Sequence, residues 1–391
     1  MMNEKLLKVI RYSLWHTETA VADRSVYDEM VKHAIAILPA TVLSSLSLPE
    51  KLFQEWESMI YQQIAYNANC RHVQKDLPVK VPFVILKGTS AAKYYPNPVL
   101  RTLGDIDIIP RREDFETAYE ELLNAGYRIE KELGRETCFV KDGIMVELHR
   151  SFAKLNNPSY AEYLDDLIIE NINPTHVLPD IVNGLVLLEH ISQHLVRGLG
   201  LRQIIDWMMF VNKCLPEEQW EEFREMAKNI GLDTLAITLS RMCEIFLGLP
   251  RHAWCEGANE EICNMLMEYI LSCGNFGNNR MTVQGLSENV LIYARNPVAF
   301  FKLLQSSGME RWKPTEKYFF IRPFAWVYQA GRYVKRGLSQ KNSLKSLKAA
   351  FSESRKRKKM FDFLGVRQDS KGLTVYKDGV YIKEKTKLFR K

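Results

Sequence analysis

A block of strand patterns, residues 81–152, constrains the fold of this chain most, because helical periodicity occupies both of its flanks. Apolar–polar alternation, or a short apolar run ended by glycine, is typical of strands. Helical patterns separate the first three strands, and a Lys141-Asp142-Gly143 turn joins the last two. The block therefore predicts an α+β unit with the strands VPFVILKG, LGDIDIIP, YRIEKEL, ETCFVKDG and IMVELHRSF.

The flanking stretches place apolar residues at three- and four-residue intervals, which indicates amphipathic helices. The segments are VYDEMVKHAIAIL and LFQEWESMIYQQIAYNANCRHVQ before the block, and NGLVLLEHISQHLVRG, LRQIIDWMMFVNKC, EEQWEEFREMAKNIG and DTLAITLSRMCEIFLG after it. We expect an α+β fold class, with a small mixed β-sheet core. The expected regions are N-terminal helices (1–80), the core (81–152), a helical domain (153–335) and a basic C-terminal extension (336–391).

The composition is that of an ordinary folded protein, since 46% of residues are hydrophobic and 26% charged. No apolar run is long enough to span a bilayer, and MMNEKLLKVIRYSLWH lacks the apolar core of a secretion signal. We therefore expect a cytoplasmic protein with no membrane span. The seven cysteines are scattered and never spaced as C-x-x-C, so neither a disulfide framework nor a zinc ribbon is indicated.

Basic charge is concentrated between residues 332 and 367, including the run Arg355–Lys359, with only Glu353 and Asp362 opposing it. Such a stretch suits nucleic acid, an anionic lipid surface or an acidic partner, although a solvated basic helix is commoner. Overlapping its start, RPFAWVYQAGRYVKRG interleaves aromatic and basic side chains, which suits nucleic acid or a packed helix covered by long basic side chains. The tail predicts one small hairpin around Lys377-Asp378-Gly379.

Three carboxylates stand on the polar faces of two predicted strands. Asp105 and Asp107 alternate with apolar Ile106 and Ile108, so both carboxylates leave the same face. Glu147 likewise alternates with apolar Val146 and Leu148, so its carboxylate leaves the polar face of its own strand. If the two strands are neighbours, the carboxylates form a cluster that suits hard divalent cations and phosphoryl or nucleotidyl transfer.

A phosphate-binding turn is predicted at Gly88, which ends one apolar strand and begins a short helix. Glycine allows a ligand to approach the backbone closely, and a helix N-terminus offers free N–H groups to phosphate. Lys87, Thr89, Ser90 and Arg101 are the candidate side chains for charge and hydrogen bonds to a nucleotide.

At these residues the sequence resembles the nucleotidyltransferase superfamily that includes DNA polymerase β and the aminoglycoside nucleotidyltransferases. More closely, ILKG…R-x-x-GDIDI…VELH is similar to a bacterial family of uncharacterised nucleotidyltransferases, from about Pro82 to Phe152 and diffusely to Val211. The resemblance matches Gly88-Thr89 to a Gly-Ser pair, Asp105 and Asp107 to a metal-binding pair, and Glu147 to the third carboxylate. The chain departs from the pattern by Thr89 in place of serine, a longer gap from Gly88 to Asp105, and glutamate as the third acid.

The resemblance implies a Mg²⁺- or Mn²⁺-dependent enzyme that moves an NMP group from an NTP, such as ATP, to an acceptor hydroxyl and releases pyrophosphate. A sugar or antibiotic hydroxyl, another small molecule, a peptide, a protein side chain and an RNA end are all compatible acceptors. Two alternatives stay open. One is a phosphotransferase that uses the same site, and the other is a non-catalytic relative that binds nucleic acid through the basic C-terminal region.

A second set of polar residues suits an acceptor cleft: His149, His190, His194 and Arg202. His190 and His194 are four residues apart and so share one helix face. A zinc-protease motif is excluded because isoleucine follows His190. The alternative is an ordinary polar helix face, on which Asp206 pairs with Arg202.

Overall fold

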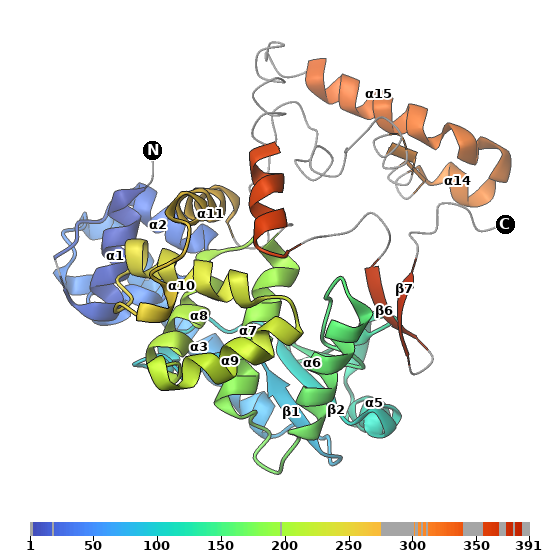
Figure 1. Ribbon diagram of the computed structural model, residues 1–391, viewed down its shortest axis with the longest axis horizontal. Helices are drawn as coiled ribbons and strands as arrows, with labels where there is room; N and C mark the ends of the chain where they lie inside the picture. The colour runs from blue at the N-terminus through green and yellow to red at the C-terminus, as the bar shows by residue number, and fades with distance from the viewer. Residues whose placement is uncertain are drawn as a thin grey trace.

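The structure is a computed structural model that describes residues 3–17, 19–195, 198–274, 312–338, 355–366, 373–377 and 380–384, with a few positions between 301 and 309. Helices surround one mixed sheet (Figure 1). No helix of the described residues is long and apolar enough to cross a membrane.

The sheet has five strands in the order β1-β2-β5-β4-β3. The β2–β5 pair is parallel and the other pairs are antiparallel. This confirms the predicted mixed sheet and all five predicted strands. Their bounds are β1 Phe83–Leu86, β2 Ile106–Pro110, β3 Arg128–Leu133, β4 Glu136–Lys141 and β5 Ile144–His149.

The predicted turn between β4 and β5 is present, and its backbone explains the residue types. Asp142 and Gly143 both have positive φ values, 51° and 76°. A two-residue hairpin turn of this kind needs the left-handed region at both positions, which aspartate tolerates and glycine adopts freely. Because the type of turn determines which residues of β4 and β5 are paired, it also sets the register of this hairpin.

The two faces of the sheet pack into two separate cores. Alternate residues of β2 and β5, such as Ile108 and Leu148, join one core with α5 (Phe115–Asn124) and the end of α3 (Glu50–Lys75). Ile109 and its neighbours on the opposite face join the large core with α4 (Gly88–Ala92) and the helices that follow the sheet. The polar side chains of β2 and β5 therefore face the large core.

The helical regions on both sides of the sheet are confirmed, with one correction. VYDEMVKHAIAIL was expected to be one helix, but α2 ends at Lys32 and Ala34 has a φ of 56°. The chain turns there so that Ile35 and Ile37 still become buried. The other helices are α1 Glu4–Trp15, α6 Pro158–Glu170, α7 Asp180–Leu195, α8 Leu201–Cys214, α9 Glu217–Asn229, α10 Asp233–Leu247 and α11 Glu260–Cys273.

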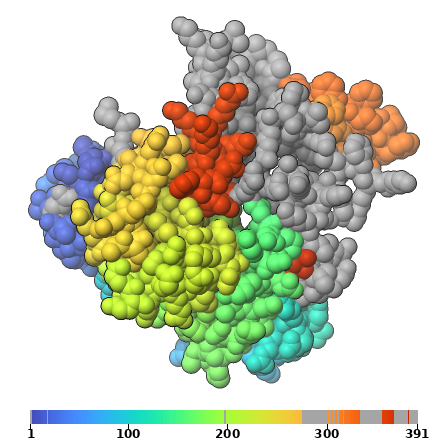
Figure 2. Space-filling view, in the orientation of Figure 1, coloured from blue at the N-terminus to red at the C-terminus, as the bar shows by residue number. Residues whose placement is uncertain are grey.

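The C-terminal region contains α14 (Pro314–Lys317), a 3₁₀ segment η8 (Phe319–Phe324) and α15 (Ala325–Leu338). The basic run begins a helical segment, 355–363, on the surface beside α11 (Figure 2). Met360, Phe361 and Leu364 bury its apolar side in the large core, while most of its basic residues remain exposed. The predicted hairpin is confirmed as β6 (Leu373–Lys377) and β7 (Val380–Glu384), although its turn residues lie outside the described residues.

The large core includes residues from both helical flanks, from the sheet and from 360–366. The expected region boundaries at 80, 152 and 335 therefore stay predictions. Much of the predicted extension 336–391 lies outside the described residues.

Candidate functional site

Two of the predicted carboxylates meet at the parallel pair of strands. Asp107 on β2 lies directly opposite Glu147 on β5. Side chains in register on one face of neighbouring strands are close together. Asp107 is buried, with 1% of its surface exposed, whereas Glu147 is partly exposed.

His149 joins these two carboxylates from the end of β5. Its Nε2 lies 2.9 Å from Asp107 Oδ1 and 3.6 Å from Glu147 Oε2. One ligand atom from each of Asp107, Glu147 and His149 lies within 4.8 Å of the others. His149, which the sequence suggested for the acceptor cleft, thus lies inside the carboxylate cluster.

Lys87 supplies the positive charge of this site. Its Nζ lies 2.5 Å from Asp107 Oδ1 and 5.8 Å from the centre of the Phe152 ring. Burial alone would lower the pKa of Lys87, but the nearby Asp107, Asp105 and Glu147 carboxylates raise it above its ordinary value. The ammonium group therefore stays charged.

The two in-register carboxylates have opposite electrostatic environments. Burial would raise the pKa of Asp107, but Lys87 and His149 together hold it below its usual range. Burial, with the charges of Asp107 and Asp105 added to it, raises the pKa of Glu147 to about 8. At neutral pH one carboxyl is firmly ionised while its neighbour can hold a proton.

Asp105 lies at the edge of the cluster. It is exposed, precedes β2 and does not belong to the close group formed by Asp107, Glu147 and His149. Its charge nevertheless acts on both Lys87 and Glu147. The strand begins only after Asp105, so its place in a carboxylate cluster stays a prediction.

The predicted phosphate-binding turn lies beside the same strand. Gly88 has a φ of 29°, and a Cβ atom there would lie 3.7 Å from the carbonyl oxygen of Asp105. The two hydroxyls that follow have partners inside the protein: Thr89 Oγ1 donates to Gln74 at 2.6 Å, and Ser90 Oγ donates to the Ile85 carbonyl at 2.7 Å. Both hydroxyls are thus already engaged within the protein, and a nucleotide contact by Thr89 or Ser90 stays a prediction.

Arg101 forms a buried ion pair with α8. Its Nε and Nη2 donate to the two carboxylate oxygens of Asp206, at 3.1 and 2.8 Å. Tyr95 donates to the same carboxylate at 2.8 Å. The sequence assigned Asp206 to Arg202, four residues away, but the bidentate partner comes from the loop before β2. A nucleotide contact by Arg101 stays a prediction.

The candidate acceptor residues lie on α7 and α8. The His190 and His194 rings are 4.8 Å apart, which confirms that they share a face. Burial lowers the pKa of His190 well below its ordinary value, and the positive charge of Lys87 adds to this effect. One Arg202 nitrogen lies 3.9 Å from the position of a Cβ on Gly104, next to Asp105. Their role in an acceptor cleft stays a prediction.

The sequence missed two residues of β4 that border the cluster. Glu136 Oε2 lies 3.5 Å from His149 Nδ1, and Cys138 Sγ lies 3.8 Å from Glu147 Oε1. Each is the register partner of the residue that it contacts. Counting residue pairs outward from the Asp142-Gly143 turn would have identified both.

A model of the family described as uncharacterised nucleotidyltransferase matches residues 15–248. The match begins in α1 and ends just after α10, so it includes the whole sheet and the helices that face it. Comparisons with curated proteins and with solved structures gave no match.

Proposed function

Because the chain belongs to the uncharacterised nucleotidyltransferase family, we propose that it is a metal-dependent enzyme that transfers an NMP group from an NTP to an acceptor hydroxyl. The observation that carries this proposal is the in-register Asp107–Glu147 pair with His149 beside it. Pyrophosphate is the second product. We also propose that the chain is related to the superfamily that includes DNA polymerase β, as its sequence suggests.

The donor set suits a hard divalent cation. Two carboxylates and one imidazole nitrogen lie close enough to share an ion, and Asp105 can approach from the exposed side. When bound there, Mg²⁺ or Mn²⁺ neutralises triphosphate charge and lowers the pKa of the attacking hydroxyl. Asp107 is the central ligand because it is ionised and held by His149.

The remaining residues orient the donor and move the proton. The Lys87 ammonium and the Gly88 backbone lie on the side from which a triphosphate would approach. Glu147 either binds the ion beside Asp107 or accepts the proton of the acceptor hydroxyl as a general base.

Calorimetric titration of each NTP, with and without Mg²⁺, tests the proposal. We expect metal-dependent binding by the wild-type protein, at least about tenfold weaker binding by Asp107→Asn, and unchanged binding by Glu120→Gln. Glu120 is an exposed carboxylate on α5 and serves as the matched control. Wild-type protein that binds no NTP, or an Asp107→Asn variant that binds as well as wild type, contradicts the proposal.

Product analysis separates the two enzyme alternatives. Pyrophosphate identifies nucleotidyl transfer, whereas a nucleoside diphosphate identifies a phosphotransferase at the same carboxylates. The non-catalytic alternative instead requires salt-sensitive nucleic-acid binding that survives the loss of Asp105, Asp107 and Glu147 together.

A further inference from the structure

An exposed aromatic face covers η8 and the start of α15. We define it by six residues: Tyr318, Phe319, Phe320, Phe324, Trp326 and Val327. The three phenylalanines expose 77%, 61% and 59% of their surface. Adjacent exposed phenylalanines are unusual on a protein surface, and a contiguous apolar patch commonly marks an interaction site.

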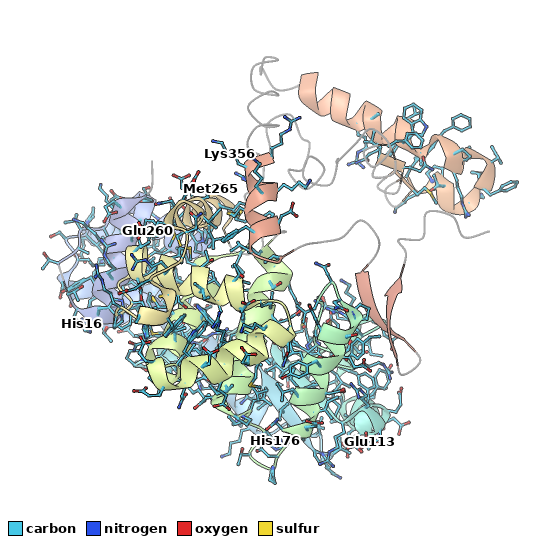
Figure 3. All side chains as sticks on the ribbon, in the orientation of Figure 1. His16, Glu113, His176, Glu260, Met265 and Lys356 are labelled. Atoms are coloured by element: carbon cyan, nitrogen blue, oxygen red, sulfur yellow. The ribbon has the colours of Figure 1, made fainter. Side chains whose placement is uncertain are left out.

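The aromatic rings form one continuous group at the start of this face. The centre of the Phe320 ring lies 5.8 Å from that of Tyr318 and 6.0 Å from that of Phe319. Figure 3 shows that α14 and α15 lie away from the helices around the sheet, with side chains standing out from the ribbon.

Several polar side chains are buried on the inner side of the same segment. Thr315, Gln305 and Gln329 are buried. The backbone of η8 is held there, because Gln305 Nε2 donates to the Arg322 carbonyl at 2.5 Å and Arg322 Nε donates to the Thr315 carbonyl at 2.8 Å. Apolar Leu304 and Ala325 are buried beside these polar groups, whereas the phenylalanines of the aromatic face are exposed. An exposed cluster of aromatic rings suits a surface that meets an apolar medium.

Basic residues flank the aromatic face. From residue 312 to residue 332 the sequence has four basic residues (Lys313, Lys317, Arg322 and Arg332) and a single acidic one, Glu316. The first three of the basic residues are exposed. A cationic rim around an apolar centre is complementary to an anionic lipid headgroup layer over acyl chains.

We propose that the aromatic face docks the protein on an anionic lipid bilayer. The phenylalanines enter the headgroup–acyl boundary, Tyr318 and Trp326 lie at the level of the headgroups, and Lys313, Lys317 and Arg322 contact lipid phosphates. The bases of single-stranded nucleic acid also stack on aromatic rings. We favour lipid because the three most exposed residues of the face are phenylalanines, which carry no hydrogen-bonding group, and apolar Val327 is 47% exposed beside them.

Vesicle flotation of the full chain tests the proposal. We expect it to float with vesicles of equimolar phosphatidylcholine and phosphatidylglycerol, and much less with phosphatidylcholine alone. Phe319→Ala/Phe320→Ala/Phe324→Ala should lower the partition coefficient at least about tenfold. Lys313→Gln/Lys317→Gln should lower the preference for anionic vesicles several-fold.

Two matched controls define the site. Val21→Ala/Tyr61→Ala removes side chains that are 61% and 64% exposed elsewhere and should leave flotation unchanged. Lys356→Gln/Lys359→Gln, in the basic helical segment, should also bind like wild type. Wild-type protein that does not float, a triple variant that floats equally, or binding that depends on Lys356 and Lys359 instead overturns the proposal. So does single-stranded RNA that binds through the three phenylalanines while vesicles do not.

Discussion

Asp107 is enclosed by three ionisable side chains that come from the two strands beside β2. Lys87 follows β1, Glu147 lies opposite on β5, and His149 ends β5. Each partner lies close enough for its charge to change the protonation of the others. The charges of these residues are therefore coupled, so a substitution at one of them changes the electrostatic environment of the others.

Lys87→Met should destabilise the protein strongly in EDTA, by about 3–5 kcal/mol, because buried carboxylates lose their positive partner. Added Mg²⁺ or Mn²⁺ should restore more stability to the variant than to the wild type. Thermal unfolding with EDTA and with each cation measures both effects. Lys93→Met is the control, since Lys93 and Asp180 form a partly exposed pair at 2.7 Å that should be worth less than about 1 kcal/mol. A Lys87→Met variant that unfolds like wild type in EDTA would contradict this account.

Glu189, on α7, should make the stability of the fold depend on pH. It is fully buried, its carboxylate accepts the Lys154 backbone N–H at 2.7 Å, and burial raises its pKa from 4.5 to about 8. The folded chain therefore keeps a proton that the unfolded chain loses between these pH values. Its contribution to stability falls as pH rises through this window, by at most about 5 kcal/mol.

Glu189→Gln removes this titration and keeps an oxygen acceptor for Lys154. The wild-type free energy of unfolding, minus that of the variant, should decline from pH 4.5 to pH 8. Urea unfolding at several pH values measures the difference. A difference that is constant over this range would show that Glu189 has an ordinary pKa in the folded state.

At the scale of elements, the contact between α7 and α8 depends on a glycine. A Cβ atom on Gly184 would lie 2.2 Å from Cζ of Phe210, which is closer than real Cβ contacts. Phe210 is itself fully buried and lies against Trp207 and Phe223. The ring cannot move without disturbing that aromatic group, so the two helices need glycine here.

Gly184→Ala should therefore destabilise the protein by about 1–3 kcal/mol through overpacking. Gly331→Ala, in α15, is the matched control because nothing lies within 4 Å of its added methyl group. There the substitution should be neutral or stabilising by up to ~1 kcal/mol, since alanine favours the helix. Denaturant unfolding compares the two, and equal effects would mean that the α7–α8 contact relaxes easily.

At the scale of the whole molecule, the C-terminal hairpin is attached to the segment that follows the candidate site. The Tyr381 hydroxyl on β7 donates to Asp165 on α6, more than two hundred residues away in sequence. The same carboxylate accepts the backbone N–H groups of Phe152 and Ala153, at 3.1 and 2.9 Å. The chain leaving β5 and the C-terminal hairpin therefore share one buried anchor.

Tyr381→Phe should release the hairpin while the sheet stays folded, because one hydrogen bond to a buried carboxylate is worth about 1–3 kcal/mol. Hydrogen exchange should become faster for the amides of β6 and β7 and remain unchanged for β1, β2 and β5. Tyr61→Phe, at an exposed position on α3, should change neither set. Uniformly faster exchange throughout the sheet would mean instead that the hairpin supports the whole fold.

Local pattern in the sequence determined the order of strands and helices along the chain, the β4–β5 turn, and the face on which Asp107 and Glu147 lie. These features follow from the period of side-chain directions and from turn residues, which depend on a few neighbouring positions. The helix expected through Ala34 was wrong for the same reason. Periodicity reports which residues become buried, and Ile35 and Ile37 become buried after a turn as well as in a helix.

The tertiary structure alone decided which charged groups are partners. Three pairs join different segments of the chain: Lys87 with Asp107, Arg101 with Asp206, and Tyr381 with Asp165. No local pattern in the sequence indicates that these segments are in contact. Burial makes the loss of one partner costly, and burial depends on how helices pack over the sheet. Sequence pattern therefore identified the carboxylates, whereas packing determined their partners and protonation.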